Sequence, residues 1–316
     1  MNNRLHSNFP ESINHKIPKT KVNYQDLILE PPKPNIKTKK DSLRFVIDSR
    51  DRDYQKYPNP NNYVIDFTNE VTNVTSIELV KGYVPNSQYV INNTNNTLHY
   101  QYEGECCINS KKLENGNYTI EDLQEALNDK FENMLYFEYT EIKKKYKITN
   151  LKNDKIKLIF KDYDCHKCKD CGKCKQCFHS NEIKYLKTSI GQVIGFNPKN
   201  VHVGKKETIL PPNIINLNTN NYIILSISEL SKIHSNRDCL QGAYSIIPFE
   251  YYLDKQINAS TSSNMNDVKY FNPPIPRFRK LTIKFLNRDG SLYDFNGVDH
   301  ILDFRVFSLN YKDVYG

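Results

Sequence analysis

Tryptophan is absent from this chain of 316 residues, whereas tyrosine occurs 22 times and phenylalanine 15 times. Its aromatic contacts therefore depend on tyrosine and phenylalanine, a bias that suits strands and interfaces better than helices. No apolar run approaches the ~20 residues that cross a bilayer as a helix. The opening stretch, MNNRLHSNFPESINHKIPKTK, has no apolar segment like that of a secretory signal. We therefore expect a protein that is made in the cytosol and has no membrane span.

Sequence signatures of common enzyme classes are also absent. The chain contains no Gly-x-Ser-x-Gly turn, no His-Glu-x-x-His pair and no phosphate-binding Walker loop. Asp299 and His300 are adjacent and could form an acid–base pair, but a charged turn beside a strand is the more common arrangement. We therefore predict that the protein is not an enzyme and that it has no catalytic residues.

Arginine is scarce, although the formal net charge is +8. The 44 basic residues are 35 lysines and 9 arginines, and arginine is the residue that binds phosphates in a bidentate manner. Positive charge alone supports non-specific attraction to nucleic acid rather than a binding site. We do not expect nucleic acid to be the main partner.

Cysteines are concentrated in one short stretch, where five of the eight lie between residues 165 and 177. If the central Cys171 is set aside, the spacing is C-x2-C-x5-C-x2-C, which predicts one zinc ion bound by Cys165, Cys168, Cys174 and Cys177. Cys171, His166 and His179 are substitute ligands. Four protein sulfurs leave no open position, so such a zinc ion would be structural. The alternative is a surface loop of free or disulfide-bonded thiols.

The chain divides into two parts by composition. Residues 1–42 contain prolines and scattered lysines without a sustained hydrophobic period, which predicts a flexible basic arm. Residues 43–316 are predicted to form one domain, with residues 161–182 as a cysteine-rich insertion loop.

Short β-rich runs separated by turn residues follow from Leu43 onward. Leu281, Ile283 and Phe285 alternate with polar residues, a pattern that places them on one face of a strand. Asp289-Gly290 predicts a hairpin turn. Strands are expected at 43–48, 62–67, 74–84, 97–102, 146–149, 155–160, 221–228, 279–286, 291–295 and 300–309.

One helix is expected at about 119–133. Thr119 can cap its first turn, and Asp122 stands three residues later at the capping-box position. The chain shows no alternation of strands and helices, so a parallel sheet is not expected. The sequence therefore predicts an all-β fold, an antiparallel β-sandwich or single jelly roll with this one inserted helix.

A charged strip follows the first predicted strand. Arg50 and Arg52 alternate with Asp51 and Asp53, so an extended backbone would place the cations on one side and the anions on the other. We interpret this strip as a candidate interaction site, which could pair with a neighbouring strip or with another subunit. The alternative is a solvated loop whose ion pairs contribute little.

Several of these segments, taken in order, resemble a β-rich family of virion proteins of large nucleocytoplasmic DNA viruses. The resemblance extends over about residues 43–309, with the cysteine stretch as an insertion and the N-terminal arm outside it. The segments are FVIDSRDRDYQKYPNPNNYVIDF (45–67), VTSIELVKGYVPNSQYVINNTNNTL (74–98), ENGNYTIEDLQEALN (114–128), IGQVIGF (190–196), NYIILSISEL (221–230) and FRKLTIKFLNRDGSLYDFNGVDHILDF (278–304).

The resemblance implies a single jelly-roll capsid protein, a penton (vertex) or minor capsid component that is made in the host cytoplasm and resides in the virion. Its expected partners are copies of itself, with a pentamer as one option, and the major and minor capsid proteins. The alternative function is a nucleic-acid-binding virion protein that uses a zinc knuckle.

Overall fold

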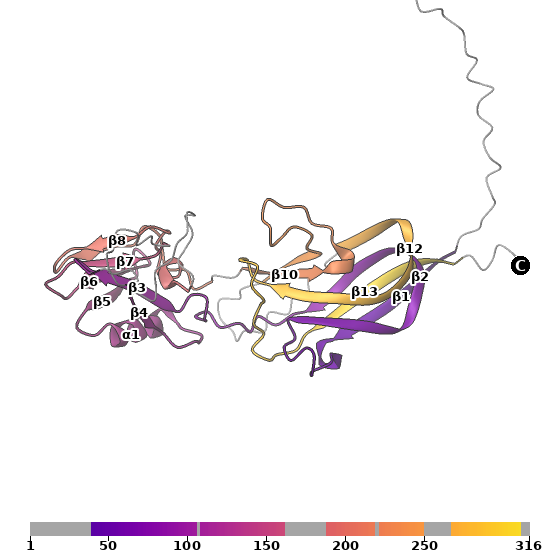
Figure 1. Ribbon diagram of the computed structural model, residues 1–316, viewed down its shortest axis with the longest axis horizontal. Helices are drawn as coiled ribbons and strands as arrows, with labels where there is room; N and C mark the ends of the chain where they lie inside the picture. The colour runs from indigo at the N-terminus through magenta and orange to yellow at the C-terminus, as the bar shows by residue number, and fades with distance from the viewer. Residues whose placement is uncertain (1–38, 106–107, 162–187, 219–220, 250–266, 311–316) are drawn as a thin grey trace, which may run out of the picture. The chain divides into compact units, whose positions relative to one another are not determined.

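The computed structural model describes residues 39–105, 108–161, 188–218, 221–249 and 267–310 (Figure 1). Within these ranges the protein consists mainly of antiparallel strands and contains one α-helix. The prediction of an all-β antiparallel fold with one inserted helix is therefore confirmed.

The strands that lie first and last in the chain form one six-stranded sheet, which we call the sheet region. Its order is β1-β13-β2-β12-β10-β11. The strands are β1 (Lys39–Asp48), β2 (Asn62–Tyr83), β10 (Tyr222–Ile227), β11 (Ser245–Pro248), β12 (Asp267–Leu286) and β13 (Ile301–Asn310). The 3-10 turns η2 (Ser49–Asp51) and η5 (Ser228–Leu230) accompany them.

The middle of the chain, which we call the helix region, forms two smaller sheets and the α-helix. The sheet orders are β4-β3-β7-β8 and β5-β6-β9. The elements are β3 (Thr97–Tyr102), β4 (Asn109–Lys112), α1 (Ile120–Lys130), β5 (Leu135–Thr140), β6 (Lys145–Asn150), β7 (Ile156–Ile159), η4 (Ile190–Gln192), β8 (Val201–Val203) and β9 (Thr208–Ile209). In the chain, the helix region is thus an insertion between β2 and β10.

Strand β2 bends back on itself. Asn61, just before it, donates from Nδ2 to the carbonyl oxygen of Tyr293 over 2.8 Å, and the amide of Gln88, just after it, donates to the Tyr293 hydroxyl over 3.2 Å. A straight strand of 22 residues would be roughly 70 Å long, so the segments at its two ends could not both bond the same residue. The pairing of β2 with β12 is irregular between Tyr270 and Lys280, and such irregularities allow a strand to bend. The sheet therefore curls into a half-barrel (Figure 1).

The curled sheet encloses one of two large hydrophobic clusters. Leu281, Ile283 and Phe285 are buried in it, as their alternation with polar residues predicts. Tyr244 is also buried there, and its hydroxyl accepts a hydrogen bond from the Leu79 amide over 3.0 Å. This bond joins the β11 side of the sheet to the second half of β2, so it holds the curl closed.

The structure differs from the predicted strands at several places. Strands β4, β5, β8, β9 and β11 were not predicted, and β12 begins at Asp267 instead of residue 279. Segments 62–67 and 74–84 form the single strand β2, because the chain continues through a bulge instead of turning. Residues 291–295 form no strand, although Gly290 adopts the positive φ of 87° that the hairpin turn needs. After that turn only the bridge between Leu286 and Leu292 continues the pairing, so the prediction of a strand there was wrong.

Helix α1 matches its prediction closely. The Thr119 side chain accepts from the Asp122 amide and the Asp122 side chain accepts from the Thr119 amide, both over 3.1 Å. Leu123 and Leu127 are buried, and Phe131 caps the end of the helix. Capping satisfies amides that the first helical turn leaves without partners. The sequence therefore determines this element locally.

The second large hydrophobic cluster lies in the helix region. Phe137 is fully buried and meets the rings of Phe131 and Tyr146 edge-on, at centroid distances of 5.8 and 6.4 Å. The Asn128 side chain bonds both backbone groups of Phe137, over 3.0 Å to its oxygen and 2.8 Å from its amide. The last turn of α1 is thereby fixed to β5.

In the described part of the chain, no helix has the length and apolar character needed to cross a bilayer. The first strand begins at Lys39, four residues before the predicted domain boundary. The boundary between arm and domain, and the number of domains, stay predictions.

Candidate functional site

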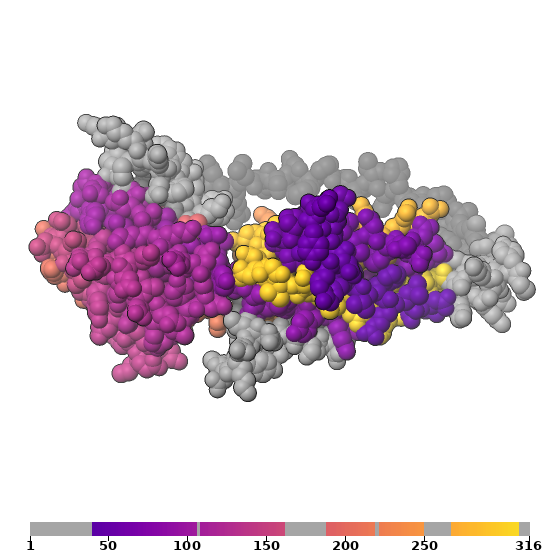
Figure 2. Space-filling view, turned by 90° about the horizontal axis from the view of Figure 1, so that it is seen from below, coloured from indigo at the N-terminus to yellow at the C-terminus, as the bar shows by residue number. Residues whose placement is uncertain are grey.

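The predicted interaction residues lie in the segment between β1 and β2, which belongs to the indigo part of the sheet region in Figure 2. Ser49, Arg50 and Asp51 form the 3-10 turn η2 instead of an extended strip, because the Asp48 side chain caps the turn by accepting from the Arg50 amide over 3.0 Å. Arg52 ends the turn and returns to extended backbone. The turn gives the two arginines different surroundings. Arg50 is exposed, whereas the side chain of Arg52 is only 3% exposed.

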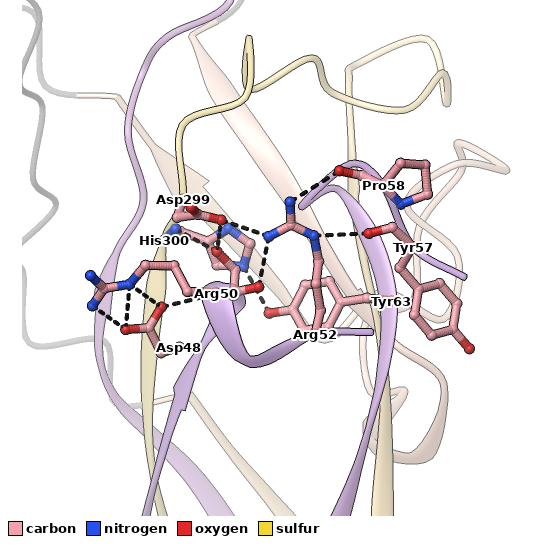
Figure 3. A network of polar contacts seen from close by, with 9 residues as sticks. Asp48, Arg50, Arg52, Tyr57, Pro58, Tyr63, Asp299 and His300 are labelled. Carbon is pink, nitrogen blue, oxygen red and sulfur yellow. Dashed lines mark hydrogen bonds and ion pairs between the residues drawn. The ribbon is translucent and has the colours of Figure 1, made fainter. Parts of the chain in front are cut away.

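Arg52 forms the centre of a polar network (Figure 3). Its Nε donates to the Tyr57 carbonyl over 2.9 Å, and its Nη2 donates to the Pro58 carbonyl over 3.0 Å. Its Nη1 donates over 2.7 Å both to the Ser49 carbonyl and to Asp299 Oδ1. A guanidinium has five N–H groups in a fixed fork, and four hydrogen bonds here hold the turn in one conformation.

Asp299 extends this network across the chain. Its Oδ1 also accepts from the Ser49 hydroxyl over 2.7 Å. That hydroxyl accepts from the His300 amide over 3.0 Å, and the Ser49 amide donates to the His300 carbonyl over 3.0 Å. The turn after β1 is therefore bonded to the segment that precedes β13, about 250 residues later in the chain.

His300 closes the inner side of the network. Its Nε2 lies 2.8 Å from the hydroxyl of Tyr63, and both residues are buried. Burial lowers the pKa of His300 to about 3 and raises the pKa of Tyr63 above its ordinary value. The rings of Phe285 and Phe295 pack against the imidazole at 4.4 and 5.1 Å. Both groups therefore stay neutral near neutral pH.

The outer side of the turn is charged and accessible. Arg50 forms an ion pair with Asp48, and the hydrogen bonds of its side chain hold the pKa of Asp48 below its usual value. Asp53 accepts from the Gln55 amide over 3.1 Å, and hydrogen bonding by Lys56 lowers the pKa of Asp53. Asp51 is exposed. The role of Arg50, Asp51 and Asp53 in contacts with a partner stays a prediction.

Sequence analysis did not assign four members of the network to the site: Ser49, Tyr63, Asp299 and His300. Asp299 and His300 were interpreted as a charged turn, and Ser49 was not considered. The alternation in NYVIDF was a signal that Tyr63 points inward. No local pattern shows that Arg52 and Asp299 meet, since the contact joins residues 247 positions apart.

The predicted zinc ligands and substitutes, Cys165, Cys168, Cys171, Cys174, Cys177, His166 and His179, lie outside the described residues. The described residues on either side of this stretch are bonded to the helix region. Before it, the Phe160 and Lys161 amides both donate to Asn200 Oδ1. After it, the Thr188 carbonyl accepts from the Thr97 amide. Within the described ranges, no group of three or more His, Cys, Asp or Glu residues could hold a metal ion. The zinc site stays a prediction.

The solved structures that resemble this chain are distant in sequence. The chain matches "Family of unknown function (DUF5901)" over residues 35–167 and 170–311. No curated protein matches it. Among solved structures it is similar to the mavirus penton protein, at 12% identity and a TM-score of 0.33 over 86% of this chain and 100% of that one. It is also similar to a chain of the Sputnik virophage, at 12% identity and a TM-score of 0.38 over 85% of this chain and 98% of that one. Both TM-scores are too low to decide fold or function, whereas the family match spans most of the sequence. The chain therefore belongs to the DUF5901 family of unknown function.

Proposed function

We propose that this protein is a structural, non-catalytic component of a viral capsid, a vertex or minor shell protein that acts by binding copies of itself and neighbouring shell proteins. One observation carries the proposal. Two segments that resemble virion proteins, residues 45–67 and 278–304, meet in the Arg52–Asp299 network. Segments that lie far apart in the chain thus share one structural unit, as expected if the resemblance reflects a common fold.

The surface of this unit suits assembly. Because Arg52 fixes the turn from inside, Arg50, Asp51 and Asp53 are presented on a rigid backbone. Rigid presentation lowers the entropy cost of binding, and charged groups at the rim of an interface select orientation and partner. We expect this turn to contact a neighbouring subunit.

The test has two parts. Mass spectrometry of purified particles of the virus that encodes the chain should detect the protein, and light scattering of the purified full chain should give the mass of a closed oligomer. Absence from the particles would disprove the shell role. A monomer that is nevertheless found in particles would leave a shell protein held by other chains and disprove self-association.

A charge reversal tests the proposed contact. Asp51→Lys should reduce oligomer formation or incorporation without lowering the thermal midpoint, because Asp51 is exposed. Glu125→Lys, at another exposed position on helix α1, is the matched control. Equal effects of the two variants would show that net charge matters and the turn does not.

A further inference from the structure

Two isoleucines in the helix region are exposed on adjacent turns. Ile142, in the turn between β5 and β6, is 95% exposed, and Ile214, in the segment after β9, is 56% exposed. Lys143 and Lys144 beside Ile142 are exposed as well. We call Ile142, Lys143, Lys144 and Ile214 the isoleucine–lysine tip.

Backbone hydrogen bonds hold the β5–β6 turn. The Lys143 amide donates to the Thr140 carbonyl and the Lys144 amide donates to the Glu141 carbonyl, both over 3.2 Å. Lys144 adopts a positive φ of 50°, which closes the turn. The Lys144 carbonyl then accepts from the Ile215 amide over 2.9 Å. The turn carrying Ile142 is therefore joined directly to the segment carrying Ile214.

The segment around Ile214 is equally well held. The Asn213 amide donates to the Gly195 carbonyl over 3.0 Å, and the Asn216 amide donates to the Val193 carbonyl over 2.8 Å. Gly195 has a φ of +90°, and a Cβ there would lie 2.4 Å from the Asn213 carbonyl oxygen, so only glycine allows this approach. The ammonium group of Lys145 donates to the carbonyls of Pro211 and Pro212 over 2.9 and 2.6 Å. Both isoleucines are thus presented by fixed backbone.

Folding does not explain these side chains. An isoleucine that remains 95% exposed contributes almost no burial to stability, whereas the neighbouring Ile148 and Ile209 face the hydrophobic cluster. Isolated exposed apolar residues are ordinary. Here two of them lie on backbone segments that are hydrogen-bonded to each other, and Lys143 and Lys144 beside Ile142 add positive charge.

We propose that the isoleucine–lysine tip binds the surface of an anionic lipid bilayer, with Ile142 and Ile214 entering the interface and Lys143 and Lys144 facing lipid phosphates. The charge favours this occupant, because residues 141–145 contain three lysines and one glutamate. A bilayer also accepts an apolar side chain on a convex turn without a matching pocket, and apolar insertion combined with lysine attraction is the usual way that proteins attach to such surfaces.

The experiment measures binding of the purified full chain to phosphatidylcholine vesicles with and without about one third phosphatidylserine, at low salt. We expect binding to the anionic vesicles and little to the neutral ones. Ile142→Ser with Ile214→Ser should weaken binding by about tenfold, and Lys143→Glu with Lys144→Glu by about twentyfold or more.

Matched variants in the sheet region serve as controls. Val46→Ser removes an apolar residue that is 64% exposed, and Lys280→Glu with Lys284→Glu reverses two exposed lysines. Both should bind like the wild type, and circular dichroism should show that all variants fold. Absence of binding to anionic vesicles, or equal losses in tip and control variants, would overturn the proposal. The proposal would also be overturned if the wild type is an oligomer in the absence of vesicles and the Ile142→Ser variant is not. The tip would then bind a second copy of the chain. The outcome does not depend on the proposed shell role, because it needs no particles.

Discussion

The sheet region and the helix region are stabilised by contacts of different range. In the sheet region, Arg52 and Asp299 meet across 247 positions of sequence, and the curl is closed by a bond between Leu79 and Tyr244 across 165 positions. In the helix region, the capping box spans three residues and the Asn128–Phe137 bonds span nine. The longer bonds there, such as the one from the Thr97 amide to the Thr188 carbonyl, stay within the middle of the chain. Local contacts form at a low entropy cost, whereas the long-range contacts require the chain to close first. We infer that the helix region can form early and that the sheet region depends on both ends of the domain.

Deleting a large aromatic side chain from each cluster should have the largest effects. Phe137→Ala and Phe285→Ala each remove a fully buried ring, which should cost about 4 kcal/mol of unfolding free energy. Hydrogen–deuterium exchange should show faster exchange in the helix region for the first variant and in the sheet region for the second. Faster exchange throughout the chain in both variants would mean that the two clusters unfold as one unit.

Arg52→Ala should destabilise the sheet region by about 3 kcal/mol, because it leaves Asp299 and three backbone carbonyls without their shared donor. Urea denaturation measures the loss. Arg52→Lys should recover little, since an ammonium group cannot reproduce the planar fork. Arg50→Ala, at the exposed arginine of the same turn, should leave the midpoint unchanged. Equal effects at both positions would show that the buried network adds nothing.

Lowering the pH should weaken both regions, because each buries one histidine. Burial lowers the pKa of His300 to about 3 and that of His99 to about 4. The ordinary value is 6.5, so the unfolded chain binds more protons and stability falls as the pH drops below about 6.5. Each histidine should lower the free energy of unfolding by about 2 kcal/mol when the pH falls from 7 to 5.

Denaturation of His300→Gln and His99→Gln at both pH values checks this expectation. Each substitution should remove its own share of the pH dependence, whatever it does to stability at pH 7. A wild-type protein with the same stability at pH 5 and pH 7 would contradict the assignment of both histidines as buried and neutral.

Thr119→Ala should have the smallest effect, about 1 kcal/mol, because it removes one side of the capping box of α1. Thr119→Ser keeps the hydroxyl and should restore most of the loss. Thermal unfolding measures both variants. If Thr119→Ser is as unstable as Thr119→Ala, the stability lost would belong to the threonine methyl group and not to the cap.

The same difference in range explains what could be predicted from sequence. The helix start at Thr119 and the strand Thr97–Tyr102 were predicted correctly, because each depends on its own few residues. The continuous strand β2 was missed, since its two halves are joined through a bulge that only the pairing with β12 reveals. At the candidate site, the Arg50–Asp53 segment was identified, but its 3-10 turn and the burial of Arg52 depend on Asp299. No pattern within the segment contains that information.

The place where the helix region joins the sheet region has a consequence for how this fold can vary. The chain leaves the sheet region at Gln88, whose amide donates to the Tyr293 hydroxyl. It returns to the sheet region at Asn221, whose carbonyl accepts from the Phe249 amide. The Phe249 ring lies 5.9 Å from that of Tyr293. Departure and return are therefore neighbours, so the intervening residues could be shortened to a brief linker, or exchanged for a different module, while all six strands of the half-barrel keep their partners. Size differences among relatives should be concentrated at this junction.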